Sequence, residues 1–119
     1  MPSWPEVFTR FGKLRALIIG DVMIDAYVWG SVERISPEAP VPIVQVSRRD
    51  FRLGGAANVA LNVLSMGATP ILCALTAQDE QGKRLIHLME EKGMSTEGIV
   101  RSSSRPTTVK SRVFAAHQH

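Results

Sequence analysis

Residues 54–75 read GGAANVALNVLSMGATPILCAL, and this stretch decides the fold class. Two glycines mark a turn, and the segment from Ala56 to Met66 that follows holds helix-forming residues with recurring apolar positions. Gly67 is typical of a helix end. Pro70 to Leu75 is a short, continuous apolar run, which is typical of a strand buried on both faces. The stretch therefore predicts a turn, a helix and a buried strand in succession.

The same alternation extends on either side of this stretch. Leu14 to Ile19 is apolar, is rich in branched residues and stops at Gly20-Asp21, so it predicts an earlier strand, also buried on both faces. Glu80 to Lys92 predicts a second helix with one apolar face, and Ile99-Val100 predicts a short third strand. This order predicts an α/β fold in which helices flank a parallel sheet.

Two β-prone segments fall outside the alternation. Val41 to Val46 reads VPIVQV, and its proline confines the segment to the edge of a sheet. Thr107 to Ala115 alternates apolar with polar residues, as a half-buried strand does. Gly30 is expected to break the mixed segment before it, and residues 31–40, which contain two prolines, are expected to form a loop. The two outlying segments could pair as a small separate sheet.

The composition is that of an ordinary globular protein. The chain has 119 residues, 45% of them hydrophobic and 21% charged, with a net charge of +3. The nearest approach to a basic cluster, Arg48-Arg49 with Arg52, is interpreted as solvated surface, so no nucleic-acid partner is expected. No run approaches the roughly 20 apolar residues that span a bilayer, and the N-terminus lacks a signal peptide, so no membrane partner is expected.

Cys73 is the only cysteine, and it lies inside the apolar run of residues 71–75. We expect it to be a small buried hydrophobe. A single cysteine can form no internal disulfide, which fits a reducing, cytoplasmic compartment.

The glycine pair at residues 54 and 55 has a chemical as well as a structural interpretation. Glycines let a backbone approach a ligand closely, and the helix that follows offers free N–H groups. Asn58 supplies both a donor and an acceptor, which suits a sugar hydroxyl. The alternative is a plain glycine-rich turn before a helix. Neither a Walker A motif nor a dinucleotide-binding fingerprint is present.

Two further sets of polar residues are candidates for ligand binding. Asp21 and Asp25 follow the first strand, where a carboxylate could accept hydrogen bonds from sugar hydroxyls; the alternatives are a turn aspartate and a helix cap. Lys110 and Arg112 share one face of the last β-prone segment, and either could pair with a phosphate; the alternative is a solvated strand face. His117 and His119 lack an acidic or cysteine partner nearby, so no metal site is expected.

Taken together, these residues resemble the ribokinase (PfkB) family of carbohydrate kinases. Residues 54–60 with Gly67 are similar to its first signature, residues 20–25 to its opening strand and sugar-binding aspartate, and Asp79 with Gly82 to its D-x-x-G step. Ala77 departs from the pattern, because that signature usually ends in glycine. The string RISPEAPVP at residues 34–42 narrows the resemblance to heptose 7-phosphate kinases of ADP-heptose synthesis. These enzymes phosphorylate C1 of the sugar with ATP and Mg²⁺, on the route to the lipopolysaccharide core.

The resemblance implies a ribokinase-like fold and a set of roles. Residues 1–119 would be the N-terminal part of a kinase domain, with a lid formed by about residues 31–50 and 107–119, and the lid often makes a homodimer. The residues implied to hold sugar hydroxyls are Asp25, Gly54, Gly55 and Asn58. Arg112 would bind the sugar phosphate, with Lys110 and Gln118 as weaker candidates.

The family's second signature, a G-A-G-D loop that carries the catalytic base, does not occur in this sequence. The resemblance therefore implies that the base lies beyond His119, that ATP and Mg²⁺ are bound mainly by a C-terminal part, and that these 119 residues alone are inactive. Two alternatives stay open: another sugar or nucleoside kinase of the family, and a non-catalytic sugar-binding or dimerisation module.

Overall fold

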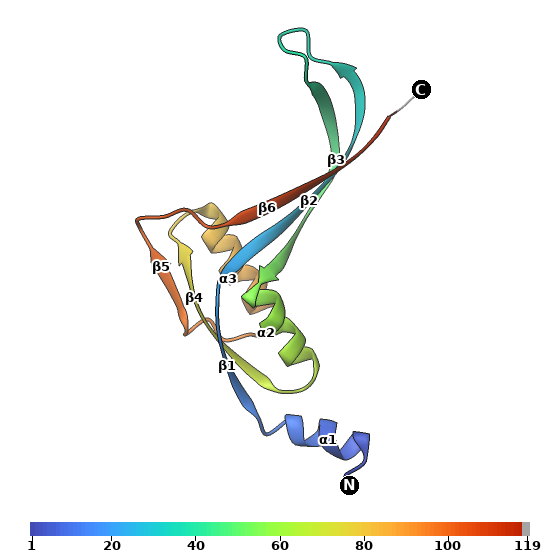
Figure 1. Ribbon diagram of the computed structural model, residues 1–119. Coiled ribbons are helices and arrows are strands. Elements are labelled where there is room, and N and C mark those ends of the chain that lie inside the picture. Colours follow the sequence, from blue (N-terminus) through green and yellow to red (C-terminus); the bar gives the residue numbers. More distant parts are fainter. Residues whose placement is uncertain (118–119) are drawn as a thin grey trace. The chain divides into compact units, whose positions relative to one another are not determined.

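The computed structural model describes residues 1–117, without the side chains of residues 33–35 and 117. The chain divides into two compact units, which are described separately. The sheet-and-helix unit comprises residues 1–24 and 53–109, and the strand unit comprises residues 25–52 and the chain from Lys110 onward. Figure 1 shows the helices and strands along the chain.

The sheet-and-helix unit is built on a parallel three-stranded sheet in the order β1-β4-β5. The strands are β1 (Arg15–Ile19), β4 (Thr69–Ala77) and β5 (Ile99–Ser102). β1 pairs with β4 from Arg15↔Thr69 to Ile19↔Cys73, and β4 pairs with β5 from Ala74↔Ile99 to Ala77↔Ser102. The predicted α/β fold with a parallel sheet is confirmed.

Two helices connect these strands, and a third precedes them. α2 (Ala56–Ser65) packs on β1 and β4, and α3 (Glu80–Glu91) packs on β4. The apolar face of α3 includes Leu85 and Met89, both with no exposed surface. Burying a side chain of this size contributes about 1.5–3 kcal/mol. The N-terminal helix α1 (Trp4–Phe11) begins with a capping box between Ser3 and Glu6 and has no buried residue.

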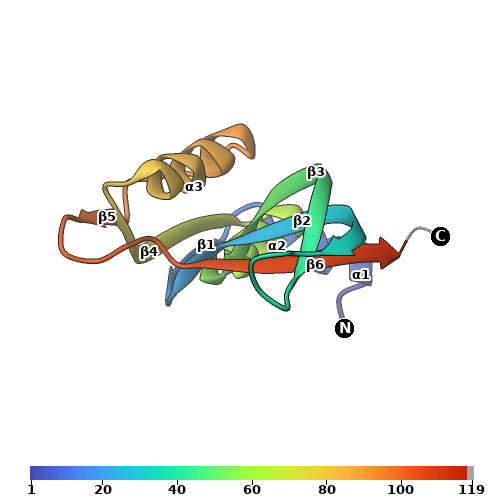
Figure 2. The ribbon, with the colours of Figure 1, turned by 90° about the horizontal axis from the view of Figure 1, so that it is seen from above.

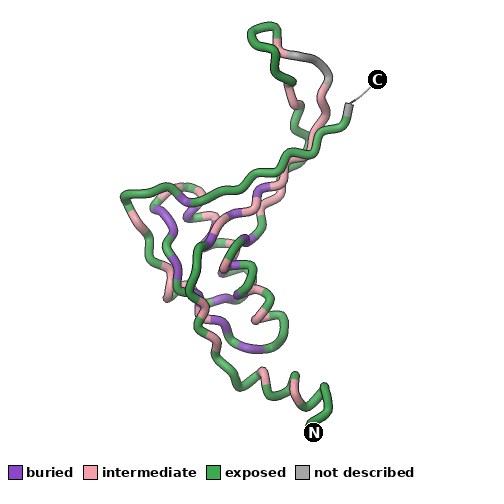
Figure 3. The backbone as a smooth tube through the Cα atoms, viewed as in Figure 1, coloured by how far each residue is buried: buried purple, intermediate pink, exposed green. Residues whose placement is uncertain are grey.

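Only one face of this sheet is covered, which corrects two predictions, and Figure 3 colours the backbone by the burial of each residue. The residues of β4 that point to one side, such as Leu72 and Ala74, are buried, whereas Leu17, Ile19, Leu75 and Val100 are 49–74% exposed. Cys73 is exposed as well. The physical reason is the crossover rule. Two right-handed connections that step across a sheet in one direction place both helices on the same face.

The strand unit consists of parts of three long strands in the order β3-β2-β6, with β2 in the centre (Figures 1 and 2). They are β2 (Val22–Ile35), β3 (Pro42–Gly55) and β6 (Val109–His117). The prediction that Val41 to Val46 forms an edge strand is confirmed, since β3 starts at Pro42 and lies at an edge of the sheet.

The prediction that Gly30 breaks the segment before it is wrong, because β2 continues to Ile35, and the loop predicted over residues 31–40 is confined to residues 36–41. A Cβ at Gly30 would collide with the carbonyl oxygen of Gln45 on β3. Glycine at this position therefore allows two strands to approach closely, which is the other role of a glycine within a strand.

Candidate functional site

The glycine pair forms the last two residues of β3, and α2 follows directly, so the predicted turn is a strand-to-helix junction. Gly55 has φ 59° and ψ −134°, a conformation that residues with a side chain rarely adopt. An added Cβ would lie 2.5 Å from the carbonyl oxygen of Asp21. That oxygen accepts a hydrogen bond of 2.8 Å from the backbone N–H of Ala56. Gly54 is buried beside it. The turn therefore attaches the chain that follows β1 to the beginning of α2.

Asn58 lies on the first turn of α2 and is exposed. Within the described part of the chain, its side-chain amide has no hydrogen-bond partner. The first turn of α2 contains no acidic residue, and no side chain caps it. Free backbone N–H groups and an unpaired amide thus occur together at the positive end of a helix dipole, which suits a polar ligand.

Asp25 begins the strand unit, and its carboxylate is largely enclosed. Its side chain is 18% exposed, and Lys110 Nζ on β6 lies 3.2 Å from its Oδ1. The two groups form an ion pair, but the geometry is not that of a hydrogen bond, so the buried Oδ1 has no hydrogen-bond donor. A buried acceptor without a donor costs about 1–3 kcal/mol, which a bound hydroxyl group would offset.

Arg112 continues the same side of β6. Its Nη1 donates a hydrogen bond of 3.0 Å to the phenolic oxygen of Tyr27 on β2, and its guanidinium lies 5.7 Å from the centre of that ring. Lys110 and Arg112 therefore do share a strand face, as their spacing predicts, and each meets a polar group of the central strand. The aromatic partner was not predicted.

This side of the strand unit is rich in aromatic rings and arginines, and we call it the cationic-aromatic face. The rings of Tyr27, Trp29 and Phe114 lie with their centres 5.7–6.2 Å apart in stacked arrangements. On β3, Arg48 lies over Trp29 at 3.8 Å and Arg52 over Tyr27 at 4.7 Å. The face consists of Asp25, Tyr27, Trp29, Arg48, Asp50, Arg52, Lys110, Arg112 and Phe114.

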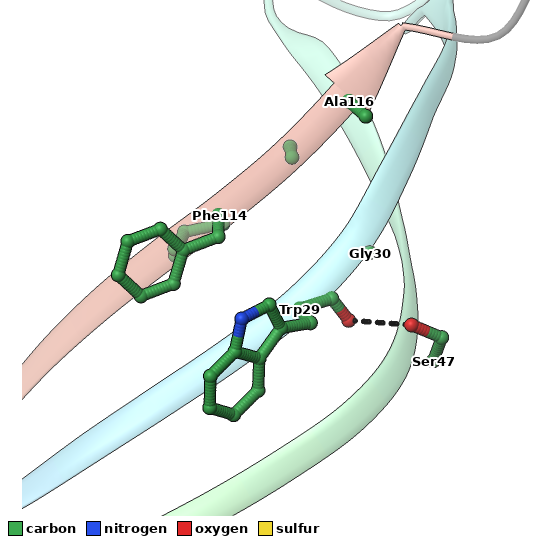
Figure 4. A pocket seen from close by; sticks show the side chains of 7 residues that line it. Trp29, Gly30, Ser47, Phe114 and Ala116 are labelled. Carbon is green, nitrogen blue, oxygen red and sulfur yellow. Dashed lines mark hydrogen bonds between the residues drawn. The ribbon is translucent and has the colours of Figure 1, made fainter.

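A shallow, open hollow adjoins this face at Trp29 (Figure 4). It measures about 520 Å³ and is lined by Trp29, Gly30, Ser47, Val113, Phe114, Ala115 and Ala116. Figure 4 shows Ser47 Oγ donating to the carbonyl oxygen of Trp29, at 3.1 Å. No lining residue is charged and none is a predicted site residue, so the hollow suits an apolar group rather than a phosphate.

A second polar cluster holds the loop before β6 in place. Asp79, the N-cap of α3, accepts hydrogen bonds from the backbone N–H of Thr107 (3.0 Å), the Thr107 hydroxyl (2.7 Å) and the N–H of Gly82 (2.8 Å). These bonds, the backbone one from Thr107 foremost, lower the pKa of Asp79. The Thr107 oxygen also accepts from the N–H of Ala77 and contacts the Thr76 hydroxyl, both at 3.1 Å.

The predicted site residues thus fall into two sets. Gly54, Gly55 and Asn58 belong to the sheet-and-helix unit, whereas Asp25, Lys110 and Arg112 belong to the strand unit. Gln118 lies outside the described residues. Sequence reasoning missed Tyr27, whose arginine partners lie on β3 and β6.

Nothing in residues 1–117 forms a group of three His, Cys, Asp or Glu side chains that could hold a metal ion. No helix in this part of the chain has the length and apolarity needed to cross a membrane.

Residues 13–119 match the pfkB family of carbohydrate kinases. The chain belongs to this family. The pfkB signature tolerates Ala77 here because that residue lies in β4, is 3% exposed, and needs no left-handed backbone. Among the described residues, only glycines have positive φ.

Two curated relatives match almost the whole of this chain, and the name of one of them specifies heptose 7-phosphate. The chain is 48% identical over 111 residues to the bifunctional protein HldE of Citrifermentans bemidjiense, covering 93% of this chain and 23% of that protein. It is 49% identical over 109 residues to the D-beta-D-heptose 7-phosphate kinase of Bordetella bronchiseptica, covering 92% of this chain and 34% of that enzyme. The chain therefore spans between about a quarter and about a third of the length of these relatives.

Solved structures agree on the fold. A fructokinase from Xylella fastidiosa superposes with a TM-score of 0.60 at 25% identity, over 83% of this chain and 29% of the fructokinase chain. Phosphofructokinase-2 from Escherichia coli superposes with a TM-score of 0.58 at 17% identity, over 84% of this chain and 30% of that chain, and shows the fold alone. The ribokinase-like fold that the resemblance implies is confirmed.

Proposed function

We propose that this chain is the sugar-binding and lid part of a cytoplasmic kinase that phosphorylates heptose 7-phosphate at C1, with ATP as the donor. The product would be the 1,7-bisphosphate used to make ADP-heptose for the lipopolysaccharide core. Family membership and the names of the two relatives support a sugar kinase of the heptose pathway. The single observation that carries the substrate class is the enclosed Asp25 carboxylate beside basic residues of β6.

Asp25 is proposed to accept hydrogen bonds from sugar hydroxyls. Its Oδ1 is buried without a donor, and Lys110 compensates part of its charge without forming a hydrogen bond. A sugar hydroxyl would supply the missing donor, and the fixed carboxylate would orient the ring. Orientation of this kind provides much of the catalysis in phosphoryl transfer.

Gly54, Gly55 and Asn58 are proposed to bind further hydroxyls. The turn at Gly55 leaves no Cβ against a ligand, and Asn58 offers a donor and an acceptor that no described side chain uses. In this proposal, the backbone conformation of the turn fixes where the amide lies.

Arg112 is proposed to bind the 7-phosphate, with Lys110 and Gln118 as weaker candidates. A phosphate removed from water needs a cation beside it, and a guanidinium can bind two of its oxygens at once. Arg112 uses one Nη group on Tyr27 and is otherwise exposed, so its outer N–H groups are available.

ATP and Mg²⁺ would supply the transferred group and neutralise its charge. We assign neither to a residue of this chain, and we propose that the catalytic base lies beyond His119. The strand unit, which overlaps the predicted lid segments 31–50 and 107–119, is proposed to cover the sugar and to join two subunits into a homodimer.

The proposal is tested by kinetics of the full-length protein with Asp25→Ala and Asn58→Ala. Each change removes about 1–3 kcal/mol of hydrogen bonding, so kcat/KM for heptose 7-phosphate should fall roughly tenfold to hundredfold while the KM for ATP stays unchanged. Asn62→Ala, one turn further along α2 and also exposed, is the matched control and should be neutral. Wild-type kinetics in both site variants would support the plain glycine-rich turn instead.

A further inference from the structure

We propose that Tyr27 organises Arg52 and Arg112 into a two-armed binding site for the phosphate group of the sugar. The inference rests on the proposed function and deepens it, because it adds a second phosphate-binding arginine and a positioning residue. Neither Tyr27 nor Arg52 is part of the sugar-hydroxyl site proposed above.

The central position of β2 in the strand unit allows one tyrosine to contact arginines from both neighbouring strands. Arg112 on β6 donates to the phenolic oxygen at 3.0 Å. Arg52 on β3 places its guanidinium 4.7 Å from the ring centre of the same tyrosine. The electron-rich face of the neutral ring attracts the Arg52 cation, and the phenolic oxygen holds Arg112, so one tyrosine restrains both arginines.

Each guanidinium keeps donors free for an anion. The Nε of Arg52 donates to Asp50 at 2.8 Å, and its Nη groups have no acceptor within residues 1–117. Arg112 uses only Nη1, on the tyrosine. A guanidinium fixed along one edge loses less side-chain entropy when its other edge binds two phosphate oxygens.

The charge of the cationic-aromatic face fits a phosphate dianion. Its described side chains include four cations, namely Arg48, Arg52, Lys110 and Arg112, against the carboxylates of Asp25 and Asp50, which leaves a net charge of +2. A free salt ion would bind to this face only weakly, whereas a phosphate that is covalently attached to a bound sugar is held beside it at a high local concentration.

The spacing along β2 fits a phosphosugar. Asp25 and Tyr27 are two residues apart on one strand face, which corresponds to about 6.6–6.8 Å. This separation is comparable with the span from a ring hydroxyl of a heptose to a phosphate at the end of its side chain. A sugar whose hydroxyls contact Asp25 would therefore direct its phosphate toward Tyr27 and the two arginines.

The test is a double-mutant cycle in the full-length enzyme with Tyr27→Phe and Arg112→Ala, together with Arg52→Ala. The measured quantity is the ratio of kcat/KM for heptose 7-phosphate to kcat/KM for heptose without the phosphate. We expect each arginine variant to lower this ratio roughly tenfold to hundredfold, and Tyr27→Phe to lower it about threefold to tenfold through KM. In the Arg112→Ala background, Tyr27→Phe should have little further effect, because the hydroxyl acts through that arginine.

Arg48→Ala is the matched control. Arg48 lies on β3 and on the cationic-aromatic face, as Arg52 does, but its guanidinium stacks on Trp29, which has no hydroxyl. The Arg48→Ala variant should therefore keep the wild-type ratio of kcat/KM for the two substrates. Inorganic phosphate should compete with heptose 7-phosphate in the wild type, and should compete more weakly in Arg52→Ala and Arg112→Ala.

Three outcomes would overturn the inference. If Arg112→Ala lowers the ratio but Tyr27→Phe and Arg52→Ala do not, the two-armed site is wrong and the proposed function stands. An equal loss in Arg48→Ala would mean that the face acts only through its total charge. If the arginine variants raise the KM for ATP and leave the ratio of kcat/KM for the two sugars unchanged, the arginines bind the nucleotide. The proposed role of Arg112 in binding the sugar phosphate would then be wrong as well.

Discussion

The Thr107 hydroxyl is predicted to be the most sensitive single group in the loop that precedes β6. Thr107 is 8% exposed, and its oxygen makes three contacts: it donates to Asp79 and accepts from the N–H of Ala77, while the Thr76 hydroxyl lies 3.1 Å away. Since the Thr107 proton is used on Asp79, the Thr76 hydroxyl must donate to Thr107. Thr107→Val keeps the shape of the side chain and removes all three contacts.

The cost can be worked out from the groups left without partners. The Ala77 N–H and the Thr76 hydroxyl both lose their acceptor in a buried place, at about 1–3 kcal/mol for each such group. Asp79 keeps two backbone donors, so its own loss is smaller. We expect the free energy of unfolding to fall by about 2–4 kcal/mol, which lowers the urea midpoint by that amount divided by the denaturant slope of the full-length protein.

The assay is urea unfolding of the full-length protein, together with amide hydrogen exchange at residue 77, which reports the lost bond locally. Thr108→Val, at the exposed neighbouring position, is the control and should shift neither quantity. Thr107→Ser retains the hydroxyl and should restore most of the stability. If Thr107→Val unfolds at the wild-type midpoint with unchanged exchange at residue 77, the reasoning about this cluster is refuted.

Three further variants test other features of the structure. Gly55→Ala places a Cβ 2.5 Å from the Asp21 carbonyl oxygen at positive φ, so it should cost about 2–4 kcal/mol in urea unfolding; a neutral result would contradict the turn geometry. Gly30→Ala should push β3 away from β2 and raise amide exchange in both strands, and wild-type exchange would count against their close approach. Asp79→Asn should destabilise at neutral pH, and the difference from wild type should shrink as the pH falls below about 4. The sign follows from the lowered pKa of Asp79 in the folded protein. The ionised carboxylate stabilises the fold at pH values above the pKa that Asp79 has in the unfolded chain, and this stabilisation is lost as the pH falls and the carboxylate is protonated. A difference between variant and wild type that does not depend on pH would contradict this reasoning.

The sequence predicted the alternating part of the fold well because local patterns determine it. The apolar positions of residues 80–92 and the glycines after each helix specify helices whose predicted ends lie within one residue of the observed ends. The branched apolar runs specify parallel strands. What a run cannot specify is which face is covered, so Leu17 and Cys73, expected to be buried, are exposed.

Long-range strand pairing was the second limit. The propensity of glycine predicts a break at Gly30. In the structure, however, β3 approaches β2 so closely at this point that only a residue without a Cβ fits, so Gly30 lies within the strand. Because the segment before Gly30 was not predicted to be a strand, Tyr27 and Trp29 were not recognised as neighbours of arginines on β3 and β6. Arg48 and Arg52 are exposed, as a solvated surface would be, yet their guanidinium groups lie on aromatic rings. Lys110 and Arg112 were found because alternation places them on one strand face, whereas Asp25 was found from its position after the first strand and from the family resemblance.

The central claim is that the substrate is a heptose carrying a phosphate, and a substrate panel tests it most directly. The measurement is ADP release by the full-length protein with Mg²⁺-ATP and each of heptose 7-phosphate, heptose, fructose, ribose and adenosine. Charge-assisted hydrogen bonds contribute about 1.5–3 kcal/mol each, so two arginines predict that kcat/KM for heptose 7-phosphate exceeds that for heptose by about 100-fold or more. Equal or higher kcat/KM for a sugar without a phosphate, or for adenosine, would contradict the account.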